Sequence, residues 1–351
     1  MDAARGRERP GLPPDVIHEP VVVWGAGAMG GSIGAWLIRA GHDVLFVDTD
    51  TEHARAIREG GLRISGPVDE FTVEAYCADP MWLDPGLKTV LLCVKAHHTP
   101  AAMEVIAPLL ARDGFVVSVQ NGLNEREIAR WVGEQRTVGC FVNFGADVME
   151  PGVVMRGNRG AVVVGELDGS TSERIRSIHR LLQDFEPDAV LTDNIHGYLW
   201  GKLAYGALLF ATALAEASIA DVLSSVTHRP TLVALAREVV AVTYAHGIRP
   251  EPFDGFNPGA FAPDARDDEA HASLDGLVQF NRASAKSHSG VWRDLAVRKR
   301  KTEVDAQIAP IADAGREVGI EAPLVRRLVE LIHDVEEGRR TQGWATLDAL
   351  A

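Results

Sequence analysis

Residues 21–30 read Val-Val-Val-Trp-Gly-Ala-Gly-Ala-Met-Gly, and this stretch decides the fold prediction. The apolar residues indicate a buried strand that runs directly into a G-x-G-x-x-G loop, and helix-forming residues follow. Gly25 permits a tight turn, Gly27 lets the backbone approach a pyrophosphate, and Gly30 lets the helix pack close to the strand. The alternative is a turn with no ligand. The strand and helix on either side favour a dinucleotide site formed by Gly25, Ala26, Gly27, Ala28, Met29 and Gly30.

An acidic residue, Asp48, follows the second predicted strand, Val44–Val47, at the distance from the glycine loop that the dinucleotide fingerprint specifies. A carboxylate at this position accepts hydrogen bonds from the ribose hydroxyls and repels the additional phosphate of NADP. Asp48 therefore favours NAD(H) over NADP(H). The alternative, that Asp48 caps the helix predicted to begin at Thr51, stays open.

Apolar runs rich in valine alternate with helical stretches from Val21 to about Gly165. This alternation predicts a Rossmann-type, doubly wound α/β sheet, because a parallel sheet is covered by helices on both faces. Val153-Val154 and Ala161–Val164 indicate a closing hairpin. The strand candidates are Val21–Trp24, Val44–Val47, Thr89–Val94, Phe115–Val119 and Thr137–Val142, and the helix candidates are Gly30–Ala40, Thr51–Glu59, Pro100–Ala111 and Glu125–Val132.

After Gly169 the strand signals vanish and helical periodicity dominates. We therefore predict a disordered leader at residues 1–19, a dinucleotide-binding domain at 20–168 and an all-helical substrate domain at 169–351. A ligand is expected between the carboxyl edge of the sheet and the helical domain. The helices predicted in the second domain are Thr171–Phe185, Tyr198–Ser218, Arg229–His246, His271–Lys286, Trp292–Val318 and Pro323–Glu337.

Composition narrows the class of protein. The net charge of −14 over 351 residues argues against binding nucleic acid, since an acidic chain repels phosphate backbones. Three cysteines and no export signal fit a cytoplasmic protein without a disulfide framework.

The longest apolar stretch, Tyr198–Ala215, is more typical of a buried helix than of a membrane crossing. No H-E-x-x-H or C-x-x-C motif indicates a metal site. The helical domain could also bury the face of a homodimer.

Lys202 is the only charged residue between Tyr198 and Ala215. An ammonium group on an otherwise apolar helix must find a partner or lower its pKa, because burying an unpaired charge is costly. A lysine tuned in this way can give a proton to a carbonyl oxygen. The alternative is a lysine whose stem covers apolar surface while its amine reaches water.

Five short motifs stand in the order found in ketopantoate reductases (2-dehydropantoate 2-reductases), which the chain resembles over nearly all of its length after the leader. The resemblance implies a Rossmann domain followed by a helical domain. It implies reduction of a 2-keto acid to a 2-hydroxy acid with a nicotinamide cofactor, typically NADPH in this family. The motifs are the glycine loop, Leu92–Lys95, Gln120–Gly122, Trp200–Leu203 and Lys301–Asp305.

The resemblance implies that Lys202 donates the proton and that Glu303 stands beside it in the active site. Glu303 would then orient Lys202 and stabilise its charged form, as an acid–base pair brought together from two helices. By itself, the basic run Arg298–Lys301 before Glu303 is typical of a solvated helix face with ion pairs.

Four further residues receive roles from the resemblance. Lys95 is expected to contact the cofactor, and Asn121 both cofactor and substrate. Ala146 matches a backbone contact to the cofactor, although an insertion blurs the alignment. Ser289 lies near the family's substrate-binding serine, with a different spacing to Glu303. Without the resemblance, Lys95 is a solvated loop lysine and Asn121 part of a turn.

Two positions depart from the family. Ketopantoate reductases carry asparagines four and eight residues after the lysine, where this chain has Gly206 and Phe210. Residues at this spacing share a helix face, so both should line the substrate pocket. A hydrogen atom and a phenyl ring in place of two amides favour a bulkier, more hydrophobic substrate.

The leading hypothesis is therefore an NAD(P)-dependent reductase of a 2-keto acid. An opine-type or 3-hydroxy acid dehydrogenase shares the two-domain plan and remains an alternative. A non-catalytic NAD(P)-binding regulator is the alternative from a different class. The Lys202–Glu303 pair argues against the regulator, because a binding module has no need of it.

Overall fold

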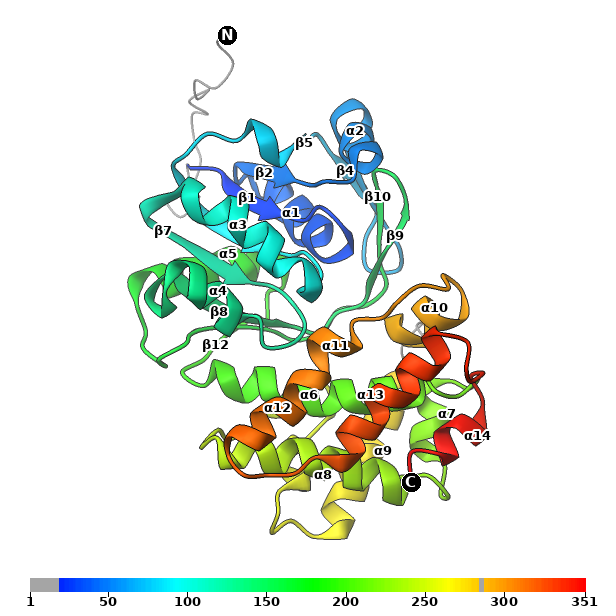
Figure 1. Cartoon of the computed structure of the whole chain (residues 1–351). Helices are drawn as coiled ribbons and strands as arrows, with labels where there is room; N and C mark the ends of the chain where they lie inside the picture. Colours follow the sequence, from blue (N-terminus) through cyan, green and yellow to red (C-terminus); the bar gives the residue numbers. More distant parts are fainter. Residues whose placement is uncertain (1–18, 284–286) are drawn as a thin grey trace.

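The computed structural model describes residues 19–283 and 287–351. Of the predicted leader, only Glu19 lies among these residues. The chain forms a twisted sheet with helices on both faces, and a helical domain lies against one end of it (Figure 1). The predicted fold class is confirmed.

The main sheet has eight strands in the order β12-β11-β8-β7-β6-β1-β2-β5. The six strands from β8 to β5 run parallel to one another, whereas β11 pairs antiparallel with β8 and parallel with β12, so these last two run the opposite way. The five strands predicted from the sequence are all present, but β6 lies two residues earlier than predicted and β7 begins five residues earlier, at Leu110. The strands are β1 Val21–Trp24, β2 Val44–Val47, β5 Tyr76–Ala78, β6 Leu87–Leu92, β7 Leu110–Ser118, β8 Thr137–Val142, β11 Val162–Glu166 and β12 Val190–Leu191.

Two apolar clusters cover the sheet and explain the continuous apolar runs. Val21 and Val23 of β1 lie in the cluster that includes α1 and α5, whereas Val22 and Trp24 lie in the opposite cluster with α3 and α4. Alternate residues of one strand thus pack on opposite faces, and all four are buried. The helices are α1 Ala28–Ala40, α2 Thr51–Gly60, α3 Thr99–Leu109, α4 Glu125–Val132 and α5 Glu173–Phe185.

A second, four-stranded sheet has the order β4-β3-β10-β9. The predicted closing hairpin is wrong, because Val153-Val154 belong to this small sheet whereas Val162–Glu166 belong to the main one. The hairpin is instead formed by β9 and β10. The strands β3, β4, β5, β9 and β12 were not predicted. The strands of the small sheet are β3 Leu62–Ser65, β4 Phe71–Val73, β9 Ala146–Glu150 and β10 Val153–Arg156.

The α/β layers extend beyond the domain boundary predicted at residue 168. Helix α5 packs against α1 and β11, and β12 adds a strand to the main sheet as far as Leu191. The sequence of α5 has an ordinary helical pattern and that of β12 is a short apolar run. Neither pattern shows whether the element packs on the sheet or in the helical domain. The first element of the helical domain is α6, Ile195–Thr212.

Helix α6 is the centre of the helical domain and packs against α8 and β8. The single helix predicted over 292–318 is wrong, because it is three short helices, with Lys299 at a φ of +50° between the first two. Pro310 lies in the first turn of the third helix, where proline is tolerated. The helices are α7 Ile219–Ser224, α8 Arg229–Ala245, α9 Asp267–Ala283, α10 Gly290–Ala296, α11 Val304–Gln307, α12 Ala309–Glu317, α13 Pro323–Glu336 and α14 Trp344–Asp348.

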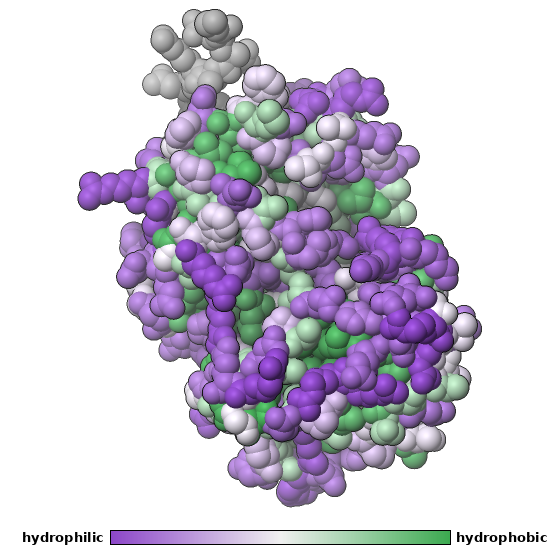
Figure 2. Space-filling view, viewed as in Figure 1, coloured by the Kyte–Doolittle hydropathy of each residue, from purple (hydrophilic) through white to green (hydrophobic). Residues whose placement is uncertain are grey.

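The molecular surface is mainly polar on the face shown in Figure 2. Within residues 19–283 and 287–351, none of the helices combines the length and the apolar character that a membrane crossing requires.

Candidate active site

The glycine loop has the geometry that its sequence predicts. Gly25 has a φ of +101°, and its amide donates to the Val47 carbonyl at 2.7 Å. A Cβ at Gly30 would lie 2.0 Å from the Gly25 carbonyl oxygen, so only glycine lets α1 approach the strand this closely.

Gly27 is different, because a Cβ there would meet no atom of the described residues within 4 Å. The loop is therefore open at Gly27, on the side where a pyrophosphate would lie. Helix α1 begins at Ala28. Among the described residues, no side chain accepts a hydrogen bond from the amides at its N-terminus, and its first turn has no acidic residue. Free amides and a positive helix end without a repelling carboxylate fit a bound phosphate.

These two glycines give a matched pair of variants. We expect Gly30→Ala to destabilise the protein by about 1–3 kcal/mol, since backbone must move to admit the methyl group. We expect Gly27→Ala to keep wild-type stability, because its φ of −66° suits alanine, but to weaken dinucleotide binding. Thermal melting and a cofactor titration measure the two effects. Equal melting temperatures for the two variants would contradict this assignment.

Asp48 follows β2 and holds the glycine loop. Its Oδ2 accepts a hydrogen bond from the Ala26 amide at 2.7 Å, and its Oδ1 accepts one from the Asp50 amide at 2.9 Å. Helix α2 is capped by Asp50, whose side chain accepts from the amides of Glu52 and His53. The cap proposed as the alternative role of Asp48 is therefore supplied by its neighbour.

His53 supports the same loop and was missed by the sequence analysis. Its side chain is buried, with Nε2 3.0 Å from the Ala26 carbonyl oxygen and Nδ1 3.1 Å from the Gly152 amide. Since the amide of Gly152 must donate, Nδ1 accepts and Nε2 donates. His53 is thus a neutral link between the loop and the β9–β10 hairpin. A lone histidine on a helix gives no sequence signal for this role.

Lys95 and Asn121 follow β6 and β7 at the same carboxyl edge of the sheet. The Lys95 Nζ lies 3.6 Å from Asp294 of α10. Asn121 is exposed, and its side chain takes part in none of the hydrogen bonds found in the described residues, although its carbonyl accepts from Asn124. Gln120, which the sequence analysis did not single out, joins the two loops through hydrogen bonds of 2.8 Å to Val94 and Thr99.

Lys202 lies on the central helix and points at the end of the sheet. Its Nζ donates to the carbonyl of Val142, the last residue of β8, and lies 5.2 Å from the centre of the Phe141 ring. Burial lowers the pKa of Lys202 to about 8, while Cys140, Asp254 and Glu303 act in the opposite direction. Among the described residues, Lys202 has no carboxylate within 4.0 Å. The Lys202 ammonium can therefore release its proton at a pH not far above neutral.

Glu303 reaches the sheet edge, but it does not pair with Lys202. Its Oε1 accepts a hydrogen bond from the Ala96 amide at 3.0 Å, next to Lys95. It is the residue before α11 and not part of a long helix, because the helix predicted there is broken. The predicted direct contact with Lys202 is therefore absent, and Glu303 acts on it only through its charge.

The remaining predicted residues are placed differently from one another. Ala146 begins β9 and pairs with Arg156. Ser289 is buried and caps α10, its Oγ accepting from the Trp292 amide at 3.1 Å. Among residues 19–283 and 287–351, a Cβ at Gly206 would meet only Ile308, at 4.0 Å, so space is open beside it. Phe210 was predicted to line the substrate pocket. It is 1% exposed and packs in the helical core, so it does not line an accessible pocket.

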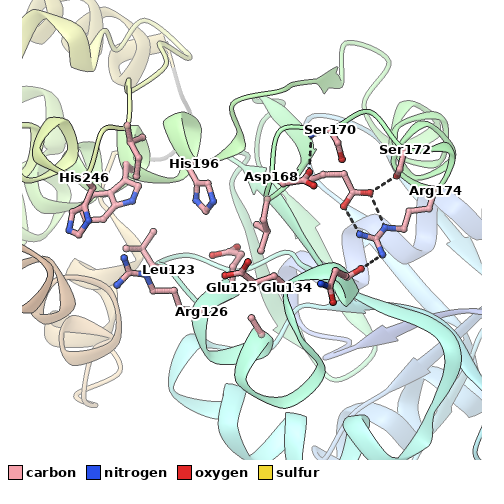
Figure 3. A pocket seen from close by; sticks show the side chains of 16 residues that line it. Leu123, Glu125, Arg126, Glu134, Asp168, Ser170, Ser172, Arg174, His196 and His246 are labelled. Carbon is pink, nitrogen blue, oxygen red and sulfur yellow. Dashed lines mark hydrogen bonds and ion pairs between the residues drawn. The ribbon is translucent and has the colours of Figure 1, made fainter. Parts of the chain in front are cut away.

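A cavity of about 780 Å³ lies elsewhere, between the two domains near the start of α6. Figure 3 shows His196 and His246 on its helical side and Glu125, Glu134 and Asp168 on its α/β side. Burial raises the pKa of Glu125 to about 7. None of the predicted site residues lines this cavity. The glycine loop, Asp48, Lys95 and Asn121 instead follow β1, β2, β6 and β7 at the carboxyl edge of the main sheet, and Lys202 and Glu303 reach the same edge.

Comparison with known families decides the identity. The family model described as "Ketopantoate reductase PanE/ApbA" matches residues 21–169, and that described as "Ketopantoate reductase PanE/ApbA C terminal" matches residues 194–336. The chain belongs to the ketopantoate reductase family. The predicted resemblance is confirmed, and with it the prediction of an NAD(P)-dependent oxidoreductase.

Relatives of this ketopantoate reductase family member are distant but match along their whole length. The 2-dehydropantoate 2-reductase of Archaeoglobus fulgidus is 28% identical over 91% of this chain and 98% of its own. That of Streptococcus pyogenes is 24% identical over 90% and 97%.

Solved structures share the fold. A PanE/ApbA family ketopantoate reductase from Ralstonia eutropha has a TM-score of 0.75 at 24% identity and covers 92% of this chain and 99% of its own. D-Mandelate dehydrogenase with NADH and anilino(oxo)acetate has a TM-score of 0.78 at 21% identity and covers 91% and 99%.

Proposed function

We propose that this family member reduces a 2-keto acid to a 2-hydroxy acid, with NADH as the preferred cofactor and a bulky, apolar substrate side chain. The observation that carries the proposal is Lys202, a partly buried ammonium at the carboxyl edge of the dinucleotide-binding sheet. It is held by a carbonyl and has a pKa near neutral, which suits a group that donates a proton.

The chain's own residues would divide the work as follows. The amides after Gly27 and the carboxylate of Asp48 would hold the cofactor, which supplies hydride when bound. Lys202 would donate its proton to the keto oxygen as negative charge develops there. Asn121, whose side-chain amide has no hydrogen-bond partner among the described residues, would orient cofactor and substrate. Lys95 and Glu303 would complete the polar side of the site.

Asp48 supports the preference for NADH. Its carboxylate accepts from the Ala26 amide beside the glycine loop, which supports a role as acceptor for the ribose hydroxyls. A phosphate on that ribose would meet a negative charge. The structurally similar D-mandelate dehydrogenase was solved with NADH, which agrees with this proposal.

The open space beside Gly206 supports a bulky substrate. The chain has only a hydrogen atom there, and the nearest atom a Cβ would meet is apolar, Ile308 Cδ1 at 4.0 Å. The D-mandelate dehydrogenase structure, with an aromatic 2-oxo acid derivative bound, is consistent with an apolar substrate group.

A matrix of two cofactors and three acids tests the proposal. NADH and NADPH are each offered with ketopantoate, a branched aliphatic 2-keto acid and an aromatic 2-keto acid, and cofactor oxidation is followed. We expect the highest kcat/KM with NADH and one of the bulkier acids. Ketopantoate as the best substrate by a wide margin would overturn the bulky-substrate proposal. Tight cofactor binding without turnover of any acid would favour the non-catalytic regulator.

The Gly206 space can be tested separately. We expect Gly206→Leu to raise KM for the bulkiest accepted acid by about tenfold. The leucine side chain would fill the space beside Gly206, and the substrate would lose apolar contacts that contribute about 1–3 kcal/mol to its binding. Gly206→Ala is the control, since one methyl group leaves most of the space open. The activity of Gly206→Leu with a small 2-keto acid should be retained. An equal loss with small and bulky acids would mean that Gly206 does not face the substrate.

A further inference from the structure

A strained turn in the helical domain lies close to Lys202. Phe253 and Phe256 exchange two backbone hydrogen bonds, of 3.0 and 2.7 Å, and enclose Asp254 and Gly255 at the tip. Asp254 has a φ of +42°, a left-handed conformation uncommon for a residue other than glycine. Such strain persists only where surrounding contacts hold it, and it often marks a functional position.

The contacts that hold Asp254 cross to the other domain. Its Oδ2 accepts a hydrogen bond from Asn143 Nδ2 at 2.7 Å and one from the Ala161 amide at 3.2 Å. Phe253 is buried beside it, with its ring 4.7 Å from that of Phe141. The turn is therefore fixed to the segment that leaves the end of β8.

Three consecutive residues, the last two of β8 and the one that follows it, join Lys202 to the turn. The Phe141 ring lies under the Lys202 amine and packs on Phe253. The Val142 carbonyl accepts from the amine, and Asn143 donates to Asp254. Whatever orders residues 141–143 thus also sets the position of the Lys202 ammonium.

We propose that Asp254 is the positioning residue for Lys202: through Asn143 and the Ala161 amide it fixes the end of β8 whose carbonyl holds the amine, and it places a negative charge on that side of the site. This rests on the proposed function only in taking Lys202 as the proton donor. The family resemblance implies this role for Glu303, but the carboxylate of Glu303 accepts a hydrogen bond from the Ala96 amide instead.

The charged and titratable groups that act on Lys202 come from three directions. They are the Cys140 thiol on β8, the Asp254 carboxylate in the turn and the Glu303 carboxylate before α11, in order of decreasing effect. Burial raises the pKa of Cys140 to about 12, so the thiol carries no charge at neutral pH. The two carboxylates therefore counter the burial that lowers the pKa of Lys202, and Asp254 is the stronger of them.

Asp254→Asn tests the charge with little change in shape. Asparagine tolerates positive φ, and its Oδ1 still accepts from Asn143 and Ala161. Asp254→Gly is the second variant, since glycine adopts this φ freely. Glu251→Gln is the matched control: it removes a charge from the same loop, and its partner Asn194 can donate to glutamine as well.

The readout is the pKa of Lys202 itself, measured by NMR of the chain's six lysines after ¹³C-methylation, with Lys202→Arg assigning the signal. We expect Asp254→Asn and Asp254→Gly to lower this pKa by about 0.5 unit or more, because an opposite charge is lost. The alkaline limb of kcat should shift downward equally, and Glu251→Gln should shift neither.

An unchanged Lys202 pKa in both Asp254 variants would overturn the inference, whatever happens to stability. The NMR titration needs no turnover. Failure of the wild-type protein to reduce any 2-keto acid would therefore count against the proposed function alone.

Discussion

Replacing Lys202 with methionine is expected to reduce kcat for 2-keto acid reduction by about 10²–10⁴-fold, the range that a positioned proton donor contributes. Methionine fills a similar volume but carries no proton to donate. The loss should appear in kcat more than in KM, because the proton is needed in the transition state. Cofactor affinity should change little, since the glycine loop and Asp48 are untouched.

Two comparisons separate catalysis from folding. Lys88→Met removes an exposed lysine that pairs with Glu19, and we expect it to keep full activity. Lys202→Met should melt no lower than the wild type, because burial lowers the pKa of Lys202 and the charge is therefore held at a cost. A Lys202→Met protein that retains more than a tenth of wild-type kcat would remove Lys202 from the mechanism.

The same lysine sets the pH dependence. Reduction requires the protonated amine, so kcat should fall as pH rises through the pKa of Lys202, about 8. Below that value the amine stays charged and the rate should level off. The free energy of unfolding should change in the opposite direction. In the unfolded chain the lysine stays protonated to higher pH than in the folded protein, so the free energy of unfolding should rise as pH increases above about 8. Measuring both profiles distinguishes the effect on catalysis from that on stability.

The parts of the site that sequence predicts well are local or chemically isolated. The glycine loop follows from three residues within one turn, and the structure gives each the predicted geometry. Lys202 stood out because no other charge lies on its stretch of helix. Both signals depend on a few neighbouring residues, so they need no knowledge of tertiary contacts.

The parts that sequence predicts poorly depend on packing between distant segments. Glu303 was paired with Lys202, but the Ala96 amide, 207 residues away in sequence, engages its carboxylate. Phe210 follows Lys202 by eight residues on α6 and yet lies in the core, because it packs among buried residues of the other helices. Asp254 and His53 gave no signal, since their roles come from contacts with Asn143, Ala161 and Gly152.

Replacing Asp48 with serine is expected to lower kcat/KM for NADH by about 10²-fold, since two hydrogen bonds to a charged acceptor contribute about 1.5–3 kcal/mol each and part of this is retained by the hydroxyl. The activity with NADPH should rise at the same time, because the carboxylate that repels the ribose phosphate is gone. The ratio of kcat/KM for NADH to kcat/KM for NADPH therefore reports on the ribose contact of Asp48, even if the glycine loop becomes more mobile in the variant.

Asp50→Ser is the matched control for this change. Asp50 lies two residues away, carries the same charge and caps α2 through the amides of Glu52 and His53, a role that serine also fills. We expect Asp50→Ser to keep the wild-type preference between NADH and NADPH. The loss of the Ala26 hydrogen bond in Asp48→Ser should affect both cofactors alike, because that contact shapes the loop under the pyrophosphate. A change in preference that is equal in the two variants would assign the effect to net charge near the loop and not to the ribose contact of Asp48.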